Sequence, residues 1–415
     1  MALLLVSCAA MPREAHIDDD DLFVYLEVRQ PENPREIYWP LEEDDDDGAS
    51  FQAQLDELLW AVQTATNPTD IIYAYFEMKY LSYIYLQEVD LRPVLDMTRF
   101  GTYNIERWMA NLVQRRRLLW ETNLAFVNTE RHDFTINFIG EEELNDIRME
   151  HWASFDRDIP EGEEIFHFVI TGEPGKAYPP LMAVNAQHTI RLVPNEEGGW
   201  LITLHFFPGS VRKFYRTGPL RYYDDDEVLA AILEEFDSAG IAAVEPRAGS
   251  RLYNPIFAAD YAKAFAEHNN PAFYRINDWM GNCMNFVSQS ILHGFGSGEI
   301  PEDSLSRFMT REWFAGSGGG APAWENVGFF WQYVTSGGAL QGQVLDSASA
   351  LRVGDIVLTR TLYVFHQDDP ERFTHSLIVV DSDTLLLAQN TPANFIYYSD
   401  LVNTVRRYIR PVAVG

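Results

Sequence analysis

The chain has 415 residues, 47% of them hydrophobic, and carries a formal net charge of −31. This length and apolar content suffice for two or three domains with buried cores. The negative charge argues against nucleic acid and anionic membrane surfaces as partners, because both would repel the protein. The chain contains two cysteines, which excludes a framework of several disulfides.

The sequence of residues 1–50 predicts a leader followed by an acidic linker. Leu5-Val6-Ser7-Cys8 resembles the cleavage box of bacterial lipoproteins, in which the cysteine is lipidated after export. The apolar stretch before Cys8 is short and lacks a basic start, so either the true start lies upstream or the match is accidental. We expect an extracytoplasmic protein whose membrane contact is a lipid anchor at Cys8. The acidic runs 18–21 and 42–47 are interpreted as a solvated tether.

Residues 51–220 predict an α+β domain. Apolar residues at helical spacing indicate helix over 51–90, interrupted at Asn67-Pro68, and a shorter helix near 105–120. Alternation of apolar and polar residues then predicts an antiparallel sheet with strands over 134–139, 165–170, 188–193 and 200–205. This order resembles the cone of nuclear-transport-factor-like domains, a fold that does not by itself assign a function.

Residues 221–250 are interpreted as a linker with a short helix over 227–239, leading to a C-terminal domain over 251–415. The run Arg115-Arg116-Arg117 is basic within an acidic chain. We interpret it as an internal salt-bridge surface in preference to a ligand site.

The most informative motif is a cysteine at a predicted helix start. Asn282 suits an N-cap, apolar residues follow at helical spacing, and Gly294 can end the helix, so Cys283 falls at the first helical position. The positive end of a helix favours the thiolate, and its unpaired N–H groups can hold an oxyanion. Far downstream, His375 opens a strand rich in Val and Ile, and its imidazole would take the thiol proton.

Each residue also has a structural interpretation. A single cysteine is more often a small buried hydrophobe, and a histidine at a strand edge is more often a satisfied polar group. The joint pattern of Cys283, His375 and a third polar residue on the next strand favours catalysis. His366 is a competing base, but its polar surroundings indicate a solvated loop.

Other polar and aromatic residues near the motif are interpreted structurally. Asn285, Ser288 and Gln289 are expected to bond neighbouring backbone. Trp313 and Trp324 flank a glycine-rich run, where core packing beside a surface loop is favoured over a flexible lid.

Residues 251–415 resemble the putative amidase domain, a family placed with the papain-like cysteine hydrolases. The family's Asp-Cys-Thr-Asn-Phe-Val-Ser-Gln helix corresponds to residues 282–289. Its other motifs occur here in the same order, as Tyr253-Asn254-Pro255, Trp324-Glu325-Asn326-Val327, Val353-Gly354-Asp355-Ile356-Val357, His375-Ser376-Leu377-Ile378-Val379 and Ala388-Gln389-Asn390-Thr391.

The resemblance implies roles for three residues: Cys283 as nucleophile, His375 as base and Asn390 as the residue that orients the imidazole, as an asparagine does in papain-like proteases. The chain departs from the family at Asn282, Met284 and Asn390, where the family has Asp, Thr and His. These departures leave the nucleophile and base in place but put the rate and the substrate in doubt.

We therefore expect an α+β protein whose C-terminal papain-like domain hydrolyses amide or peptide bonds in the bacterial cell envelope through an acyl-thioester. Peptide or peptidoglycan is the expected substrate class. The alternatives are a non-catalytic envelope lipoprotein that serves recognition, and transfer of the acyl group to an amine. Motifs for metal, nucleotide and serine-hydrolase chemistry do not occur, so no cofactor and no metal are expected. The oligomeric state is left open.

Overall fold

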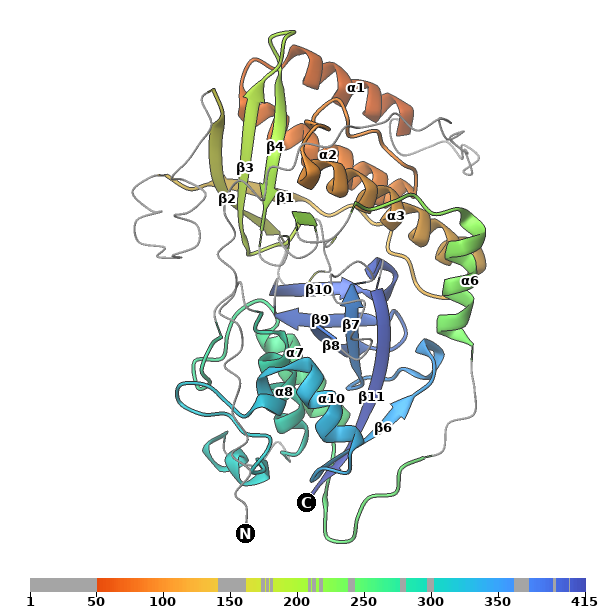
Figure 1. The fold of residues 1–415 in the computed structure, drawn as a ribbon, viewed down its shortest axis with the longest axis vertical. Coiled ribbons are helices and arrows are strands. Elements are labelled where there is room, and N and C mark those ends of the chain that lie inside the picture. The colour runs from red at the N-terminus through yellow and green to blue at the C-terminus, as the bar shows by residue number, and fades with distance from the viewer. Residues whose placement is uncertain are drawn as a thin grey trace, which may run out of the picture.

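The structure is a computed structural model that describes residues 51–140, 162–172, 176, 179, 182–207, 210, 214–215, 219–237, 243–276, 281–296, 302–361, 373–390, 393–402 and 404–415. These residues form an N-terminal half and a C-terminal half, each with helices and an antiparallel sheet (Figure 1). The predicted α+β class is confirmed. Cys8, both acidic runs and His366 lie outside the described residues, so the expectations for them stay predictions.

The N-terminal half begins with three helices, α1 (Phe51–Thr64), α2 (Pro68–Tyr85) and α3 (Phe100–Thr122). The predicted break between α1 and α2 is confirmed. Asn67 caps α2 by accepting a hydrogen bond from Thr69 N at 3.0 Å, and Pro68 is the first helical residue. The helix α3 starts earlier than expected and includes Gly101, where the ring of Tyr215 occupies the space that a Cβ would need.

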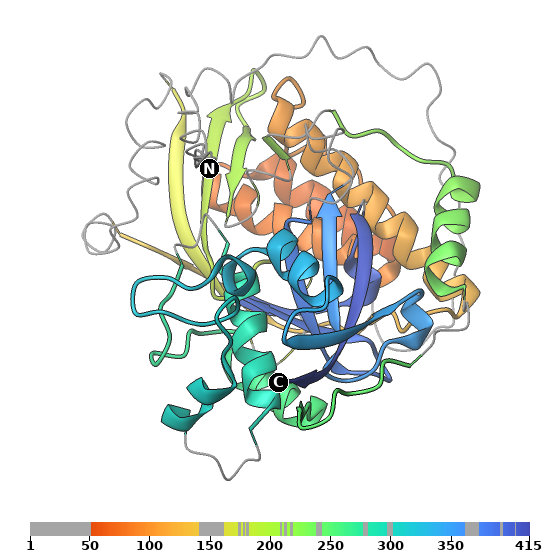
Figure 2. The same cartoon turned by 60° about the horizontal axis from the view of Figure 1, so that its bottom comes forward.

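Four strands follow, and they confirm the predicted antiparallel meander. They are β1 (Phe134–Phe138), β2 (Glu164–Gly172), β3 (Gln187–Pro194) and β4 (Trp200–Phe206), in the order β1-β2-β3-β4. Helices and sheet share one hydrophobic core, to which α2 and α3 contribute Ile72, Phe76 and Ile105 and the strands contribute Phe168, Ile190 and Leu204. Figure 2 shows the three helices lying along this sheet.

The C-terminal half is built on a seven-stranded antiparallel sheet with the order β10-β9-β8-β7-β11-β5, with β6 also paired to β11. Its strands are β5 (Arg251–Leu252), β6 (Leu340–Leu345), β7 (Ile356–Thr361), β8 (His375–Asp381), β9 (Leu386–Asn390), β10 (Ala393–Tyr397) and β11 (Thr404–Val414). The helices are α7 (Pro255–Phe265), α8 (Cys283–Gly294), α9 (Pro322–Glu325) and α10 (Val327–Thr335), with 3-10 turns η3 (Glu302–Phe308), η4 (Ala348–Ala350) and η5 (Tyr398–Asp400).

Alternation along the strands divides this sheet into two buried faces. Ile378 and Val380 of β8 join the core formed with α7, α8 and α10, whereas Leu377 and Val379 join a second core on the opposite face. Phe236 packs against that second core. Because successive side chains of a strand point to opposite faces, one short strand serves both cores.

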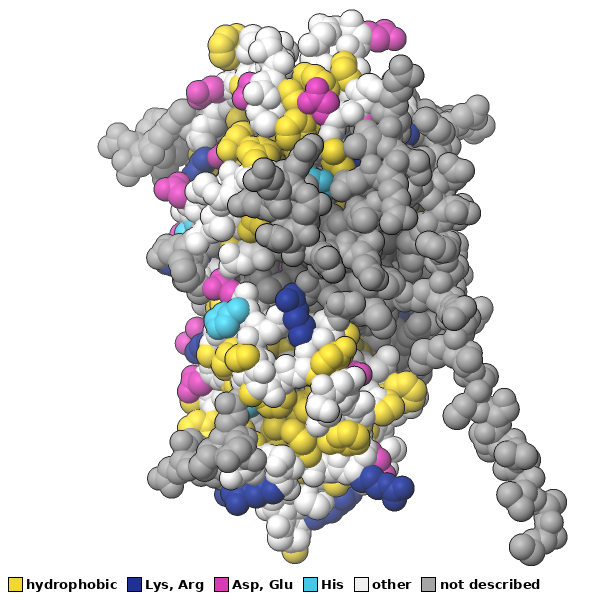
Figure 3. Space-filling model, turned by 90° about the vertical axis from the view of Figure 1, so that its left-hand side faces the viewer, with side chains coloured by type: hydrophobic (Ala, Val, Ile, Leu, Met, Phe, Trp, Pro, Cys, Tyr) yellow, Lys and Arg dark blue, Asp and Glu magenta, His cyan; other side chains and the backbone are white. Residues whose placement is uncertain are grey.

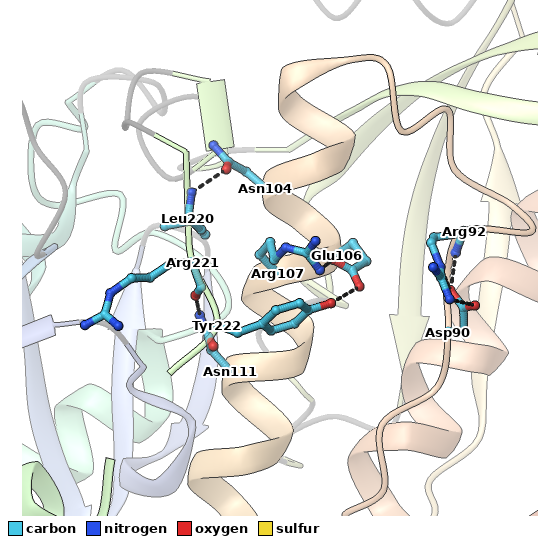
Figure 4. A network of polar contacts seen from close by, with 9 residues as sticks. All are labelled: Asp90, Arg92, Asn104, Glu106, Arg107, Asn111, Leu220, Arg221 and Tyr222. Atoms are coloured by element: carbon cyan, nitrogen blue, oxygen red, sulfur yellow. Dashed lines mark hydrogen bonds and ion pairs between the residues drawn. The ribbon is translucent and has the colours of Figure 1, made fainter. Parts of the chain in front are cut away.

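The predicted linker begins as a segment bound along α3 (Figure 4). Side chains of α3 bond to it by hydrogen bonds from Leu220 N to Asn104 Oδ1 (2.9 Å), from Asn111 Nδ2 to Arg221 O (3.0 Å) and from Tyr222 Oη to Glu106 Oε1 (2.7 Å). The segment continues into α6 (Asp225–Phe236), whose start is held by a capping box between Asp224 and Glu227. The chain between the halves is therefore partly built into the fold.

Buried charges join the two halves. Arg116 of α3 pairs with Asp400 of η5, and both side chains are fully buried. Arg115 pairs with Glu235 of α6 at 2.6 Å, and Arg406 of β11 pairs with the same carboxylate. The interpretation of the three arginines as an internal salt-bridge surface is confirmed for these two.

The side of the molecule in Figure 3 shows how the surface chemistry is distributed. Apolar side chains are visible over both the upper and the lower half, and the described acidic side chains on this side lie apart from one another. The large negative charge is therefore not concentrated in one acidic patch among the residues described on this side.

Candidate active site

The cysteine motif forms the start of α8. Cys283 is the first helical residue and Gly294 the last, as predicted. Asn282 occupies the N-cap position, but its side chain makes no capping hydrogen bond, so the predicted cap is wrong. The Asn282 Oδ1 instead accepts hydrogen bonds from Ile276 N at 3.2 Å and Asn285 Nδ2 at 2.8 Å. This leaves the first N–H groups of α8 uncapped by Asn282.

The Cys283 thiol is buried, with 5% of the residue exposed. Burial by itself raises the pKa of this thiol. The charge of His375, together with smaller contributions from the His375 side chain and from Ser376, outweighs burial and lowers the Cys283 pKa from 9.0 to about 7. A thiol with this pKa is substantially ionised at neutral pH, as a sulfur nucleophile requires.

His375 is the first residue of β8, a strand that packs against α8. Its Nε2 lies 2.7 Å from the Oε1 atom of Gln389 on the neighbouring strand β9. An amide oxygen only accepts hydrogen bonds, so Nε2 carries a proton in this pair. In the neutral ring, Nδ1 is then the nitrogen whose lone pair can take a proton.

Asn390, the predicted partner of the imidazole, forms hydrogen bonds with residues of the helix layer. Its Oδ1 accepts a hydrogen bond from Asn282 Nδ2 at 2.8 Å, and its Nδ2 donates to Phe265 O at 3.0 Å and Ala266 O at 3.2 Å. These bonds join the end of α7, the residue before α8 and the end of β9. The structure thus places Asn390 at the helix start and brings Gln389 to the ring.

The register of β8 and β9 explains why Gln389 lies at the imidazole and Asn390 at the start of α8. Ile378 lies opposite Ala388, so these two side chains share a face. By alternation, His375 and Gln389 belong to one phase of the two strands, and Ser376 and Asn390 to the other. The sequence interpretation missed Gln389. The glutamine of the family's Ser-Gln-His-Thr motif was the available signal, because it aligns with this residue.

A network of buried amides surrounds the helix start. Asn285 Nδ2 donates to Tyr274 O at 2.8 Å, and Asn285 Oδ1 accepts from Gln289 Nε2 at 3.0 Å and Trp324 Nε1 at 2.7 Å. Tyr261 Oη donates to Gln289 Oε1 at 2.6 Å. The expectation that these side chains bond neighbouring backbone is thus correct in part, since most of their described partners are side chains.

The two tryptophans beside the glycine-rich run are part of the core. Trp313 is 0% and Trp324 1% exposed, and their ring centroids lie 4.8 Å apart. Ser288 joins them, because its Oγ donates to Trp324 O at 2.9 Å and accepts from Trp313 Nε1 at 3.1 Å. The core-packing interpretation is confirmed, and the two rings support the wall behind α8.

Two searches of the described residues returned nothing. No group of three or more His, Cys, Asp or Glu side chains among them is arranged to hold a metal ion. None of the helices that the structure describes combines the length and the apolar character needed to cross a bilayer.

Residues 252–406 match the family model described as the putative amidase domain. The match covers the C-terminal part of the chain and confirms the resemblance inferred from the short motifs. Comparisons with curated proteins and with solved structures found no match. Fold and family together define an α+β chain whose C-terminal part is amidase-like, and the family description indicates hydrolysis of amide bonds.

Proposed function

We propose that the protein is a cysteine-dependent hydrolase of amide or peptide bonds with a papain-like site in its C-terminal half. The observation that carries this proposal is the placement of Cys283 as the first residue of α8, a helix packed against β8, which begins at His375. His375 and Ser376 also lower the pKa of the buried Cys283 thiol to about 7. An inert buried thiol would have a raised pKa, because burial disfavours the charged form. Groups that overcome burial at a single thiol are typical of a nucleophile.

The residues support a two-step reaction. The Cys283 proton passes to His375, and the thiolate attacks the amide carbonyl carbon to form a tetrahedral intermediate. The C–N bond then breaks, His375 returns the proton to the leaving amine, and an acyl-thioester remains. Water, deprotonated by His375, attacks the thioester carbonyl carbon. The C–S bond then breaks, the carboxylic acid leaves, and His375 returns the proton to the Cys283 sulfur.

Two further parts of the site assist this reaction. The backbone N–H of Cys283, at the first position of α8, is suited to hold the oxyanion, a role worth about a hundred- to a thousand-fold in turnover. Gln389 orients the imidazole, and Asn390 holds Asn282 at the helix start. This assignment moves the orienting role from Asn390, where the sequence motif suggested it, to the preceding residue.

A non-catalytic recognition protein is the alternative from another class. The departures at positions 282, 284 and 390 would then record lost chemistry. The lowered pKa of Cys283 argues against this alternative, because a recognition surface has no need of an ionised buried thiol. Transfer of the acyl group to an amine would use the same residues and differ only in the second nucleophile.

Substrate and compartment belong to the same proposal. The family description supports an amide substrate, and the lipoprotein-like sequence before Cys8 supports an extracytoplasmic location with a lipid anchor. A peptide of the cell wall is the substrate class that unites the two. Mass spectrometry of the N-terminal peptide from the native host tests the anchor, and an unmodified peptide that begins at Met1 would end that part of the proposal.

The reaction is tested by trapping the acyl-enzyme. The full-length protein is incubated with cell-wall digests, quenched in acid and analysed by peptide mass spectrometry. We expect an acyl adduct on the Cys283 peptide of wild-type protein and none on Cys283→Ala. Absence of any adduct, together with an ordinary alkylation profile that His375→Ala leaves unchanged, would favour the recognition protein.

A further inference from the structure

A group of titratable side chains is buried in the core of the N-terminal half. Tyr75 and Lys79 lie on α2, His188 on β3 and His205 on β4, and each of these residues is at most 1% exposed. The apolar rings in contact with the two imidazoles are those of Phe76, Phe168 and Phe207. Titratable groups among apolar rings are costly to bury unless hydrogen bonds satisfy them.

Hydrogen bonds join these side chains in a chain that ends at a carbonyl. Lys79 Nζ donates to Tyr75 Oη at 3.0 Å, and Tyr75 Oη lies 3.0 Å from His205 Nδ1. His205 Nε2 lies 3.0 Å from His188 Nδ1, and His188 Nε2 lies 3.3 Å from Ala183 O. Ala183 has a φ of 42°, in a region that few residues other than glycine adopt. A strained backbone thus presents the carbonyl at which the chain of hydrogen bonds ends.

This carbonyl fixes the position of every proton in the chain. A carbonyl oxygen only accepts, so His188 Nε2 carries a proton, and Nδ1 of the neutral ring accepts. His205 Nε2 therefore donates to His188, which leaves His205 Nδ1 to accept from the Tyr75 hydroxyl. The Tyr75 oxygen in turn accepts from Lys79. All the hydrogen bonds run in one direction, from the ammonium to the carbonyl.

A proton added to either imidazole breaks this order. On His205 the proton occupies Nδ1, so the ring no longer accepts from Tyr75. On His188 it sets one N–H group against another, unless His205 moves its own proton from Nε2 to Nδ1 and again stops accepting from Tyr75. In every case a buried donor loses its acceptor, and a second positive charge enters the core beside Lys79.

The groups that face the imidazoles oppose their protonation. Burial and, to a smaller extent, the charge of Lys79 lower the pKa of His205 well below 6.5. Burial lowers the pKa of His188 to about 3, and the charge of Lys79 acts in the same direction. Tyr75 and Lys79 face the pair from α2, and Tyr215 Oη bonds the backbone N and O of His205 at 3.0 Å each.

The other elements packed against β3 and β4 direct their charged groups elsewhere. On the strands, His167, Thr189 and Arg191 belong to the face of the sheet opposite to His188, and His167 Nδ1 lies 2.8 Å from Thr189 Oγ1. On α2, Glu77 pairs with Arg131 at 2.8 Å. Charged side chains of α3 pair with one another, with α6 or with η5; they are Glu106, Arg107, Arg115, Arg116, Arg117 and Glu121.

We propose that this hydrogen-bonded chain is an acid-sensitive element, which stabilises the N-terminal half while His188 and His205 are neutral and destabilises it in acid. Both rings are harder to protonate in the folded protein than in the unfolded chain, so the stabilisation is fully present above about pH 6.5 and is lost as the pH falls below that value. The same helix α2 carries Tyr83, whose Oη donates to Asp400 Oδ2 at 3.0 Å, so its loosening would reach the junction with the C-terminal half. This inference does not depend on the proposed function.

The proton positions are tested first, in the full-length wild-type protein. Nitrogen-15 spectra of histidine-labelled protein distinguish the two neutral tautomers from the charged ring, and His188→Gln and His205→Gln identify the two signals. At pH 7.5 we expect both rings to be neutral with the proton on Nε2. A proton on Nδ1 of either ring, or a charged ring, would overturn the proposal, and this result needs no variant to remain stable.

Hydrogen exchange of the β3 and β4 amides between pH 8 and pH 5, corrected for the intrinsic rates, tests the acid response. Each imidazole that gains a proton on opening should raise the opening constant about thirty-fold at pH 5, so the pair should contribute about a thousand-fold. His188→Gln keeps a donor and an acceptor but does not titrate, and it should remove one factor of about thirty. His268→Gln, at an exposed position of the C-terminal half, is the matched control and should keep the full rise. Equal rises in wild type, His188→Gln and His205→Gln would overturn the proposal.

Discussion

The Nε2 atom of His375 lies 2.7 Å from the Oε1 atom of Gln389, across the pair of strands β8 and β9. In the proposed reaction, this contact would orient the imidazole and leave Nδ1 to exchange a proton with the thiol. In the proposed triad, this neutral amide would have the role that a carboxylate or an asparagine has in other triads. It holds the tautomer without adding a charge.

Replacement of Gln389 by Ala should therefore slow the chemistry without removing it. Loss of a partner that orients a metal-ligating histidine costs about 10- to 100-fold in activity, and we expect an effect of this size here. We expect Cys283 alkylation at pH 7 to be slowest in His375→Ala, faster in Gln389→Ala and faster again in Asn390→Ala. A larger effect of Asn390→Ala than of Gln389→Ala would restore the orienting role to Asn390.

The departures at positions 282 and 390 lie at two residues in contact, since Asn282 Nδ2 donates to Asn390 Oδ1 at 2.8 Å. We expect Asn282→Asp alone to destabilise the fold by about 1–3 kcal/mol, because a carboxylate cannot donate this bond. With Asn390→His the pair becomes the Asp and His of the family, which can bond again. A double-mutant cycle of urea unfolding should give a favourable coupling of about 1 kcal/mol or more, and strict additivity would contradict the pairing.

The titration of Cys283 predicts how stability varies with pH. Its pKa is lowered from 9.0 to about 7 in the folded protein, so folding favours the thiolate. This contribution is fully present above the unfolded value near 9 and is lost as the pH falls through about 7. Two units correspond to roughly 3 kcal/mol. The unfolding free energy of wild type minus that of Cys283→Ala should rise between pH 7 and 9, and a flat difference would contradict the lowered pKa.

The stability of the protein should depend strongly on Arg116, at the junction between the halves, and only weakly on the neighbouring Arg117. Arg116→Met leaves Asp400 buried without its cation, and we expect a loss of about 3–5 kcal/mol in the free energy of unfolding. The matched control is Arg117→Ala, whose pair with Asp225 at 2.8 Å is partly exposed and should cost about 1 kcal/mol or less. Similar losses for both variants would show that burial does not decide the strength of these pairs.

Local features of the chain could be predicted from the sequence because they depend on local chemistry. The break at Asn67-Pro68, the four alternating strands and the start of α8 at Cys283 follow from backbone preferences and from the periodicity of apolar residues. The amidase-like match over 252–406 likewise depends on short motifs that keep their order along the chain.

The partners of the polar side chains were decided only by the tertiary structure. Whether Gln389 or Asn390 meets His375 depends on the register of two strands, in which one residue of shift exchanges the faces. The Asn282 side chain does not cap α8, because its amide forms hydrogen bonds with Ile276 N and Asn390 Oδ1. The sequence thus indicated the candidate nucleophile, the candidate base and the elements that carry them, whereas long-range packing decided which polar groups lie beside them.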